Sequence, residues 1–527
     1  MKKDKYYITT PIYYPSGNPH IGHCYTTVAC DSIARYKRFQ GHDVMFLTGT
    51  DEHGLKIEQK ANDAGITPKA YVDMIVERFQ RLWKYMNISY DRYIRTTDDY
   101  HIETVQKVFK ALYDKGYIYK GEYIGKYCTP CESFWTDSQL VNGKCPDCGR
   151  EVLEAREEAY FFKLSMFADA LQDFLLKTDY LRPKTRAIEL VNNFIVPGLE
   201  DLCVSRTSFK WGVPVTFDHK HVVYVWIDAL SNYISALGYK NNYYNDMEKF
   251  WPADLHMVAK DIMRFHAIIW PALLMALDLD LPKHLAVHGW ITFNGQKMSK
   301  SLGNVVDPFV LVDRYGADAV RYYLLREMAL GADSSFSNEN MIVRINSDLA
   351  NGLGNLVSRT IAMIIKYFGG CIPDDREESE LDFPLIDLAI NLYATVDKYV
   401  DDTKLNLALA EIFKLVDAAN KYIDDTTPWI LGRQSDSKAR LATVLYNLLE
   451  CIRIVSVLLS SFMPTTMPII WDRIGLASKD ATYENIKKFN ILSHNVIVSK
   501  GDVMFPRIDI NAEIDTLNQI IGKNREV

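Results

Sequence analysis

The chain has 527 residues, of which 48% are hydrophobic and 24% charged, and its formal net charge is −7. That length is too great for one ordinary hydrophobic core and predicts roughly two to four domains. The composition is typical of a globular enzyme. The negative net charge excludes binding of nucleic acid through overall basicity, so any basic surface must be local.

The start of the chain and its cysteines bear on location. The lysine-rich first residues run directly into Tyr6-Tyr7-Ile8, without the hydrophobic core of a signal peptide. The longest apolar stretches, such as residues 267–277, are too short to span a bilayer and are interrupted by proline. Nine cysteines, four of them clustered, suit a reducing cytoplasm better than a disulfide framework. We therefore expect a cytoplasmic protein that binds neither membranes nor DNA.

Residues 1–115 alternate strand and helix patterns. A β-favouring segment at 6–10 precedes a stretch with two histidines, and apolar residues then recur at helical spacing up to a glycine. His20 and His23 share one face of the first helical turn, where free N–H groups and the helix dipole attract phosphate. Gly22 leaves room for a ligand against the backbone. The stretch suggests a nucleotide site, although such a helix start taken alone is more often structural.

A second strand pattern, residues 43–47, runs into the polar loop 48–54. In open parallel sheets, ligands bind at the carboxyl ends of the strands, where this loop is expected to lie. Asp51 in the loop is able to hold an ammonium group. Because a helix follows, the same aspartate is also a candidate helix cap.

Two C-x-x-C pairs form the next group. Cys128 and Cys131 are followed, after thirteen residues, by Cys145 and Cys148, and each pair contains a proline. This spacing matches a tetrahedral zinc site with four thiolates, which leaves no open position and so predicts a structural metal. The alternative is two turns with buried free thiols.

Residues 116–220 are therefore expected to form an insertion into the sheet domain. The sheet is expected to resume with a strand at 222–226 and a helix through Tyr233, followed by strands at 255–258 and 284–288. This pattern predicts a parallel, doubly wound sheet.

The last of these strands leads to a polar, glycine-flanked loop with the sequence Lys297-Met298-Ser299-Lys300-Ser301. Two ammonium groups on such a loop are able to close over a triphosphate and neutralise the charge that develops on a departing pyrophosphate. For these five residues alone, a solvated basic loop is the simpler interpretation.

From about residue 340 only helical patterns remain. Residues 342–365, 405–423 and 441–460 have apolar residues at three- and four-residue spacing, which predicts a helical bundle.

The two-histidine stretch and the lysine loop, in this order in one chain, resemble the two signatures of class I aminoacyl-tRNA synthetases, without a substitution in either. With further segments the resemblance narrows to the methionyl-tRNA synthetase family and covers essentially the whole chain. The segments are 11–23, 48–54, the two cysteine pairs, 225–233, 260–266, the lysine loop, 351–359 and 427–429.

The resemblance implies an α/β fold. It consists of a doubly wound, Rossmann-like catalytic domain with a zinc-bearing insertion, followed by an all-α bundle. The expected domains are the two catalytic halves at 1–115 and 221–292, the insertion at 116–220, the lysine loop with a stem-contact region at 293–340, the anticodon-binding bundle at 341–510, and a tail at 511–527.

The resemblance also implies how methionine is held. Asp51 would bind the ammonium group, with a backbone contact from Ile12. The thioether would lie in a pocket whose aromatic faces suit a polarisable sulfur. Without the resemblance, ordinary core packing is the better interpretation of these aromatic residues. The pocket residues are Ile12, Tyr14, Trp226, Ala229, Leu230, Tyr233, Ile262 and His266.

For ATP, the resemblance assigns the phosphates to His20 and His23, and a close approach of the nucleotide to Gly22. Asp261 would bind the ribose, and Lys297 and Lys300 would contact the pyrophosphate. The catalytic residues are therefore expected to be His20, His23, Lys297 and Lys300. Relatives commonly have glycine where this chain has Ala259, which leaves a backbone contact with the ribose open. Magnesium bound mainly by ATP is expected, with one structural zinc on Cys128, Cys131, Cys145 and Cys148.

In the bundle, Trp429 resembles the residue on which an anticodon base stacks, with Asn355 and Arg359 as its hydrogen-bonding partners. Packing is the alternative for an isolated Pro-Trp pair. The implied function is ATP-dependent activation of L-methionine and its transfer to tRNA(Met), for the initiation and elongation of translation. Relatives often have a further carboxy-terminal module that dimerises, and this chain ends before one, so a monomer is expected.

Three alternatives can be weighed. A synthetase for isoleucine, valine or leucine needs a large editing insertion, for which residues 116–220 are too few. A catalytically inactive RNA-binding relative would not need both signatures intact. A small nucleotidyltransferase that shares the histidine signature would not explain the bundle.

Overall fold

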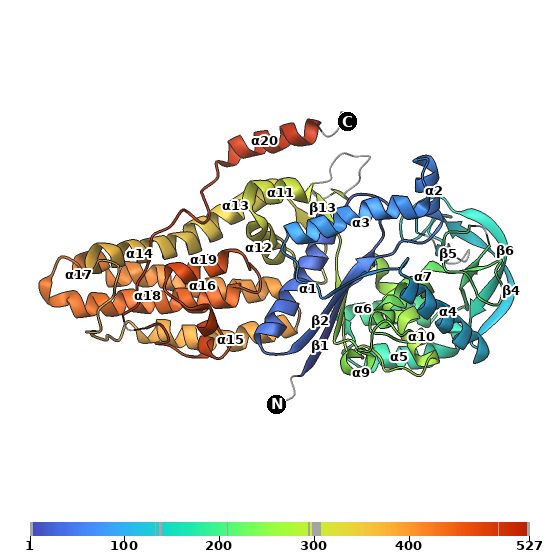
Figure 1. Ribbon diagram of the computed structural model, residues 1–527, viewed down its shortest axis with the longest axis horizontal. Coiled ribbons are helices and arrows are strands. Elements are labelled where there is room, and N and C mark those ends of the chain that lie inside the picture. Colours follow the sequence, from blue (N-terminus) through green and yellow to red (C-terminus); the bar gives the residue numbers. More distant parts are fainter. Residues whose placement is uncertain are drawn as a thin grey trace. The chain divides into compact units, whose positions relative to one another are not determined.

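The computed structural model describes residues 4–131, 133–135, 140–207, 209–293, 296–297, 307–493 and 495–523 (Figure 1). The chain divides into two compact units. The sheet unit contains Met1–Pro19, His42–Trp83 and Ser89–Gly289, and the helical unit contains His20–Gly41, Lys84–Ile88 and Trp290–Val527.

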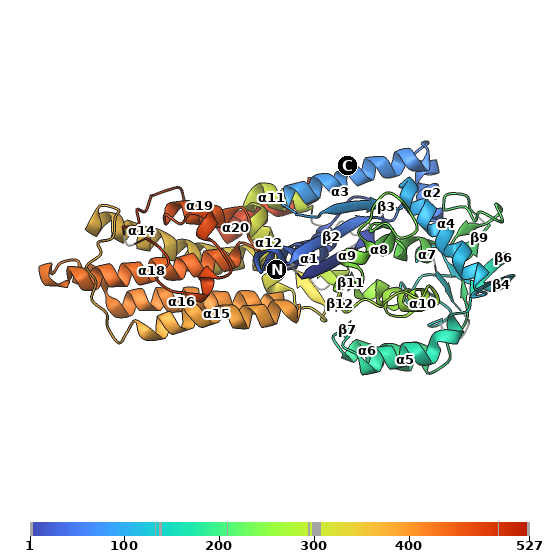
Figure 2. The ribbon, with the colours of Figure 1, turned by 60° about the horizontal axis from the view of Figure 1, so that its bottom comes forward.

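A six-stranded sheet forms the centre of the sheet unit, and all its neighbouring strands pair in parallel in the order β3-β2-β1-β11-β12-β7. Helices lie on both faces of the sheet (Figure 2). Strands β1 and β2 are mostly buried along their length, as expected for a parallel sheet covered on both sides. The strands are β1 (Lys5–Tyr13), β2 (Asp43–Thr50), β3 (Arg92–Arg95), β7 (Leu181–Arg182), β11 (Leu255–Ala259) and β12 (Leu285–His288).

The helices of the sheet unit bury apolar residues at helical spacing. In α4, Val105, Phe109 and Leu112 are buried at intervals of four and three residues, and they belong to one core cluster with Leu285 and Val287 of β12. The main helices are α2 (Leu55–Asp63), α3 (Pro68–Tyr85), α4 (Asp99–Asp114), α5 (Ala168–Lys177), α6 (Thr185–Leu190), α7 (Val225–Leu230), α8 (Asn232–Ser235), α9 (Met247–Phe250) and α10 (Trp270–Ala276).

The parallel, doubly wound sheet predicted from the sequence is confirmed, but one of its expected strands is wrong. Only Val222–Val223 forms a strand (β10), and it pairs antiparallel with β9 (Ser205–Arg206) outside the six-stranded sheet. Residues from Val225 onward are helical because α7 begins there, after Tyr224 in an extended conformation. A run rich in valine and aromatic residues favours a strand locally, and tertiary packing overrides that preference.

One strand of the parallel sheet comes from residues 116–220. Leu181 and Arg182 of β7 pair with Leu285 and Ala286 of β12. A two-residue strand leaves no periodic pattern in a sequence, so this contribution was not predicted. The same segment also contains an antiparallel sheet in the order β5-β4-β6-β8, made of β4 (Ile118–Cys128), β5 (Ser133–Trp135), β6 (Leu153–Phe162) and β8 (Leu202–Cys203).

The helical unit is a bundle in which α15 packs on α16, and α18 packs on both α14 and α16. A small sheet, β14-β13-β15, also belongs to it. The elements are α1 (Ile21–Phe39), β13 (Ile291–Phe293), β14 (Gln296–Lys297), α11 (Pro308–Tyr315), α12 (Ala317–Glu327), β15 (Ser334–Phe336), α13 (Asn338–Arg344), the π-helix η7 (Ile345–Gly354), α14 (Asn355–Phe368), α15 (Phe383–Asp401), α16 (Leu405–Thr426), α17 (Pro428–Leu431), α18 (Lys438–Leu459), α19 (Thr466–Arg473) and α20 (Ile510–Lys523).

Helix α1 is anchored in the helical unit although it lies near the start of the chain. The fully buried guanidinium of Arg321 on α12 pairs with Asp31 of α1 at 2.7 Å. Near the end of α1, the Tyr36 hydroxyl donates to Asp397 of α15 at 2.6 Å. A buried ion pair is costly to break, so these contacts fix the helix that begins with the two histidines.

The expectation that every apolar stretch is too short to span a bilayer is wrong for the segment that contains α18. Residues Ser435–Leu459 are long and apolar enough to cross a membrane by length and composition. All of the apolar window is buried inside the protein, as in the core helix of a bundle.

Candidate active site

Three neighbouring strands end at one edge of the sheet, and each is followed by a predicted site residue. The order β2-β1-β11 places Asp51 after β2, Tyr14 after β1 and Asp261 after β11. Ile12 is in register with Gly49, and the Asp51 amide donates to the Tyr13 carbonyl at 3.0 Å. The carboxyl edge of a parallel sheet is where open α/β folds bind ligands.

The loop that contains Asp51 is held rigidly. The buried carboxylate of Glu52 accepts two hydrogen bonds from the Arg95 guanidinium, at 2.7 and 2.8 Å, and one from each of the Thr50 and Thr97 hydroxyls, at 2.6 Å. Trp211 donates its indole N–H to the Glu52 carbonyl at 2.6 Å. A bidentate arginine adds geometric constraint to a charged contact.

Asp51 itself is 9% exposed and does not cap the following helix. The N-cap of α2 is Gly54, which has a positive φ of 108°. The helix-cap interpretation of Asp51 is therefore wrong, and its carboxylate stays at the sheet edge as a largely buried negative charge.

Aromatic side chains from two segments of the sheet unit, residues 226–233 and 265–266, contact one another. Trp226 of α7 stacks on Phe265 with ring centroids 3.7 Å apart and an interplanar angle of 6°. The Tyr233 hydroxyl lies 2.7 Å from Nε2 of His266, whose Nδ1 lies 3.0 Å from the Ile262 carbonyl. A carbonyl only accepts, so Nδ1 is the protonated nitrogen and Nε2 accepts from Tyr233.

The imidazole of His266 is uncharged at neutral pH. Its burial lowers its pKa to about 4, because an imidazolium is poorly solvated there. The neutral ring and the stacked aromatic pair thus belong to a largely buried, mostly apolar cluster that also contains the Tyr233 hydroxyl.

The remaining predicted pocket residues belong to the same region. Ile12 and Ile262 are half-buried against the core cluster that contains Leu230 and Tyr233. Ala229 is buried on α7, three residues after Trp226. Tyr14 is half-buried after β1, and the Lys56 ammonium lies 5.6 Å from the centroid of its ring.

Asp261 is the middle residue of the short 3-10 helix η4 (Lys260–Ile262) and is exposed. Ala259, the last residue of β11, has φ −80° and ψ 158°, a conformation that any L-residue adopts. The backbone at this position therefore does not require glycine, and the alanine adds only its methyl group.

The two histidines lie at the start of α1, as the sequence predicted. His20 is the N-cap and its Nδ1 accepts from the Gly22 amide, while Nδ1 of His23 accepts from the His20 amide, both at 3.1 Å. The two rings stack with centroids 3.8 Å apart. A Cβ at Gly22 would lie 3.0 Å from the His20 ring, so glycine is what allows the ring to fold over the helix start.

The lysine loop is only partly described. The backbone of Lys297 forms β14 with Gln296, opposite Thr292 and Phe293 of β13. Lys300 lies outside the described residues, so its role stays a prediction.

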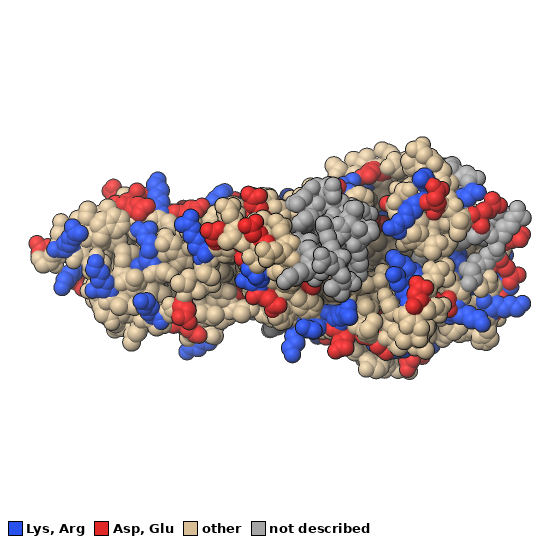
Figure 3. Space-filling model, turned by 90° about the horizontal axis from the view of Figure 1, so that it is seen from above, with Lys and Arg blue, Asp and Glu red and all other residues tan. Residues whose placement is uncertain are grey.

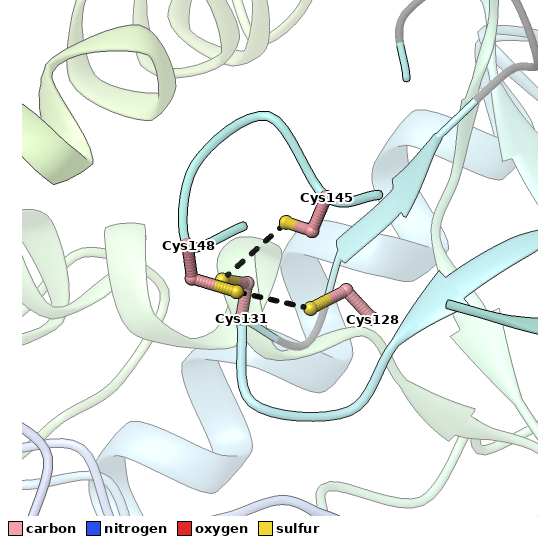
Figure 4. A group of neighbouring side chains, drawn as sticks. All are labelled: Cys128, Cys131, Cys145 and Cys148. Carbon is pink, nitrogen blue, oxygen red and sulfur yellow. Dashed lines mark hydrogen bonds between the residues drawn. The ribbon is translucent and has the colours of Figure 1, made fainter. Parts of the chain in front are cut away.

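The four predicted cysteine ligands come together into one cluster (Figure 4). Their sulfur atoms all lie within 4.8 Å of one another, with Cys128–Cys148 at 3.5 Å and Cys131–Cys145 at 3.7 Å. Tetrahedral Zn–S bonds of about 2.3 Å place sulfurs about 3.8 Å apart, which these distances match. All nine cysteines are free of disulfides, so the four thiols are available to hold a metal ion.

The cysteine cluster contacts the same segment as the aromatic pair. Arg264 places its guanidinium 4.2 Å from the ring centroid of Trp135, which is buried against the cluster, while the next residue, Phe265, stacks on Trp226. Burial raises the pKa of Asp147, between Cys145 and Cys148, and the Arg264 charge opposes that rise. The fold thus places the cysteine cluster beside the aromatic residues.

The predicted RNA-contacting residues lie on the bundle. Trp429 on α17 is 38% exposed, a large fraction for a tryptophan. Arg359 of α14 reaches Asp424, near the end of α16 and just before α17, at 3.5 Å. Gly432 lies so close to Tyr367 of α14 that a Cβ there would be 2.3 Å from its ring. Asn355 is half-buried one turn before Arg359.

The surface at this end of the bundle is mixed in charge. Figure 3 shows Lys and Arg side chains across the end of the helical unit where α14 and α17 lie, with some Asp and Glu among them.

Three buried residues that contact one another beside the Asp51 loop were not predicted. Asp228 of α7 is fully buried and lies between His53 of the Asp51 loop and His101 of α4. The available signal was a charged residue inside the apolar run 222–230, which is unusual enough to indicate a buried polar contact.

The chain matches family models and known proteins along nearly its whole length. The model described as tRNA synthetases class I (M) matches residues 6–157 and 151–361, and the model described as anticodon-binding domain of tRNA ligase matches residues 386–527. The methionine–tRNA ligase of Clostridium perfringens is 58% identical over 521 residues, which are 99% of this chain and 80% of that protein. The methionine–tRNA ligase of Halalkalibacterium halodurans is 50% identical, and the match covers 100% of this chain and 82% of that protein.

Solved structures of methionyl-tRNA synthetases are similar to this chain over nearly its whole length. Mycobacterium tuberculosis methionyl-tRNA synthetase in complex with methionyl-adenylate has a TM-score of 0.92 and 40% identity, covering 96% of this chain and 100% of that one. The apo form of the same enzyme has a TM-score of 0.85 and 37% identity, covering 96% and 99%.

The parallel sheet, the site at its carboxyl edge and these matches define a class I aminoacyl-tRNA synthetase. Relatives at 58% and 50% identity over nearly the full chain narrow the assignment further. The chain belongs to the methionyl-tRNA synthetase family.

Proposed function

We propose that this enzyme activates L-methionine with ATP to form methionyl-adenylate and then transfers the methionyl group to tRNA(Met), for the initiation and elongation of translation. The observation that carries the proposal is the combination of a largely buried carboxylate, Asp51, with a cluster of stacked aromatic rings and a tyrosine hydroxyl in the same unit. A solved relative that was crystallised with methionyl-adenylate supports it.

In the proposed complex, Asp51 binds the substrate ammonium and the Ile12 backbone contacts the substrate beside it. The thioether lies against Trp226, Tyr233 and His266, because aromatic faces attract a polarisable sulfur. Tyr14, Ala229, Leu230 and Ile262 complete the apolar wall. The neutral His266 orients the Tyr233 hydroxyl, which is then the polar contact that disfavours leucine-like side chains.

Adenylate formation needs no nucleophile from the protein. The methionine carboxylate attacks the α-phosphorus of ATP, a P–O bond to the methionine forms, and the bond to pyrophosphate breaks. His20 and His23 contact the phosphates at the start of α1, and Asp261 accepts from the ribose hydroxyls. Lys297 and Lys300 neutralise the charge on the leaving pyrophosphate, and Mg²⁺ accompanies the nucleotide.

Exchange of pyrophosphate into ATP tests the proposed substrate. With each of the twenty amino acids in turn, we expect methionine to support the fastest exchange, because only its side chain fills the pocket and places a sulfur on the aromatic faces. Homocysteine, which lacks one methyl group, is expected to be the strongest competitor among close analogues. Faster exchange with isoleucine, valine or leucine would contradict the proposal.

For tRNA, the proposal places an anticodon base on the Trp429 ring, with hydrogen bonds from Asn355 and Arg359. An exposed indole is a platform on which bases of single-stranded loops stack, and Arg359 reaches Asp424, five residues before Trp429 along the chain. The match of residues 386–527 to an anticodon-binding domain supports this placement.

The metal of the cysteine cluster is proposed to be one structural zinc ion, held by Cys128, Cys131, Cys145 and Cys148. Burial and the neighbouring thiols raise the pKa of Cys128 to about 12, because adjacent thiolates repel one another, and a divalent cation supplies the balancing charge. Free thiols persist in a reducing compartment, which supports a cytoplasmic location.

Metal analysis tests the zinc site. The purified protein is expected to contain about one zinc per chain, as a single four-ligand site requires. Cys145→Ser should reduce that content severalfold, whereas Cys371→Ser, a free cysteine outside the cluster, should leave it unchanged. A zinc-free protein from zinc-replete cells would contradict the assignment.

A further inference from the structure

A buried carboxylate joins three segments of the sheet unit. Oδ2 of Asp228 lies 2.6 Å from Nδ1 of His53, and its Oδ1 lies 2.8 Å from Nε2 of His101. His101 also contacts the Ser235 hydroxyl at 2.7 Å through Nδ1. Both oxygens of one fully buried side chain are therefore occupied by imidazoles from different elements.

The segments joined in this way are the two sides of the proposed methionine pocket. His53 is two residues after Asp51, in the loop at the end of β2. Asp228 lies on α7 between Trp226 and Ala229. His101 extends the contact to α4, whose buried apolar side chains belong to the core cluster. The carboxylate thus connects the loop that binds the ammonium to the helix that lines the thioether pocket.

The negative charge of Asp228 explains why an aspartate suits this position, because a carboxylate accepts a hydrogen bond from each imidazole. Burial alone would raise the pKa of Asp228, but the charges and hydrogen bonds of His53 and His101 overcome that effect and lower it to about 2. The ionised carboxylate is acceptor-only and takes one N–H from each imidazole. An asparagine keeps the shape but is uncharged and offers one acceptor and one donor, so one imidazole must either lose its partner or change tautomer to accept the amide N–H.

We propose that Asp228, together with His53 and His101, positions the amino-acid pocket by holding the Asp51 loop at a fixed place relative to Trp226. None of the three is assigned to contact the substrate, so they are positioning residues. The inference rests on the proposed methionine-activating function, because it assigns these residues to that same pocket.

Two variants test the proposal. Asp228→Asn and His101→Asn are expected to raise the methionine dissociation constant about tenfold, since small misplacements of binding groups have large effects, while the KM for ATP changes less than twofold. Equilibrium binding of methionine and pyrophosphate exchange measure the two quantities. A variant that stays folded, by its thermal transition, and binds methionine as the wild type does would overturn the proposal.

His221 provides a matched control. It is also a fully buried histidine with Nδ1 on a serine, Ser205 at 3.0 Å, and Nε2 near a carboxylate, Glu158 at 3.3 Å. His221→Asn should lower the thermal transition without changing methionine affinity more than twofold. If it weakens methionine binding as much as His101→Asn does, the effect is general destabilisation and the proposal fails.

A double-mutant cycle separates positioning from bulk stability. If Asp228 acts through the Asp51 loop, Asp228→Asn should reduce kcat/KM for methionine far less in an Asp51→Asn background than in the wild type. Fully additive losses would overturn the proposal. Failure of the underlying function is distinguishable, because the wild-type protein would then not bind methionine at all.

Discussion

Replacing Lys300 by alanine is expected to slow adenylate formation about 10²–10³-fold, the loss typical of removing one group that stabilises transition-state charge. Methionine affinity should stay nearly unchanged, because the Lys300 ammonium is proposed to contact the departing pyrophosphate and not the amino acid. Single-turnover adenylate formation and equilibrium methionine binding measure the two effects separately.

Equal losses in rate and in methionine affinity would refute the transition-state role of Lys300. Lys177→Ala provides a control for loss of a lysine, since Lys177 is exposed on α5 and pairs only with the nearby Asp173 among the contacts described for it. That variant should retain wild-type exchange.

Replacing Trp429 by alanine is expected to reduce the charging of tRNA(Met) on the order of 10²-fold in kcat/KM, because stacking of one base contributes about 1–3 kcal/mol. Pyrophosphate exchange should survive, since Trp429 is not among the residues proposed to bind methionine or ATP. Aminoacylation and exchange, assayed on the same preparation, give the comparison.

Two further variants sharpen this result. Trp429→Phe keeps an aromatic face and should retain most of the charging activity, whereas Ile469→Ala, which shortens another exposed apolar side chain of the bundle, should retain all of it. If exchange falls as far as charging in Trp429→Ala, the tryptophan supports the fold and does not read RNA.

The parts of the fold that local patterns encode were predictable. Strands β1, β2, β11 and β12 are short apolar runs bounded by polar loops, and the long bundle helices have clear three- and four-residue periodicity. The cysteine cluster was predictable because two C-x-x-C pairs at this spacing are specific for a metal site.

The remainder depends on contacts distant in sequence. The strand β7 exists only because two residues reach β12, and the expected strand at 222–226 gives way to α7. The Glu52–Arg95 contact spans 43 residues and the Asp228–His101 contact 127, so neither leaves a local pattern. The residues of the methionine pocket other than Asp51, and those of the proposed anticodon site, came from a family resemblance and not from periodicity.

The anchoring of α1 in the helical unit has a consequence for synthesis on the ribosome. Asp31 leaves the ribosome 290 residues before Arg321, the difference between their positions. At about 5–20 residues per second, the interval is roughly 15–60 s. During that time Asp31 of α1 cannot pair with the Arg321 guanidinium, so the final packing of α1 must wait until much of the chain has emerged. We expect folding intermediates in which α1 is not yet packed on α12 and is accessible to chaperones.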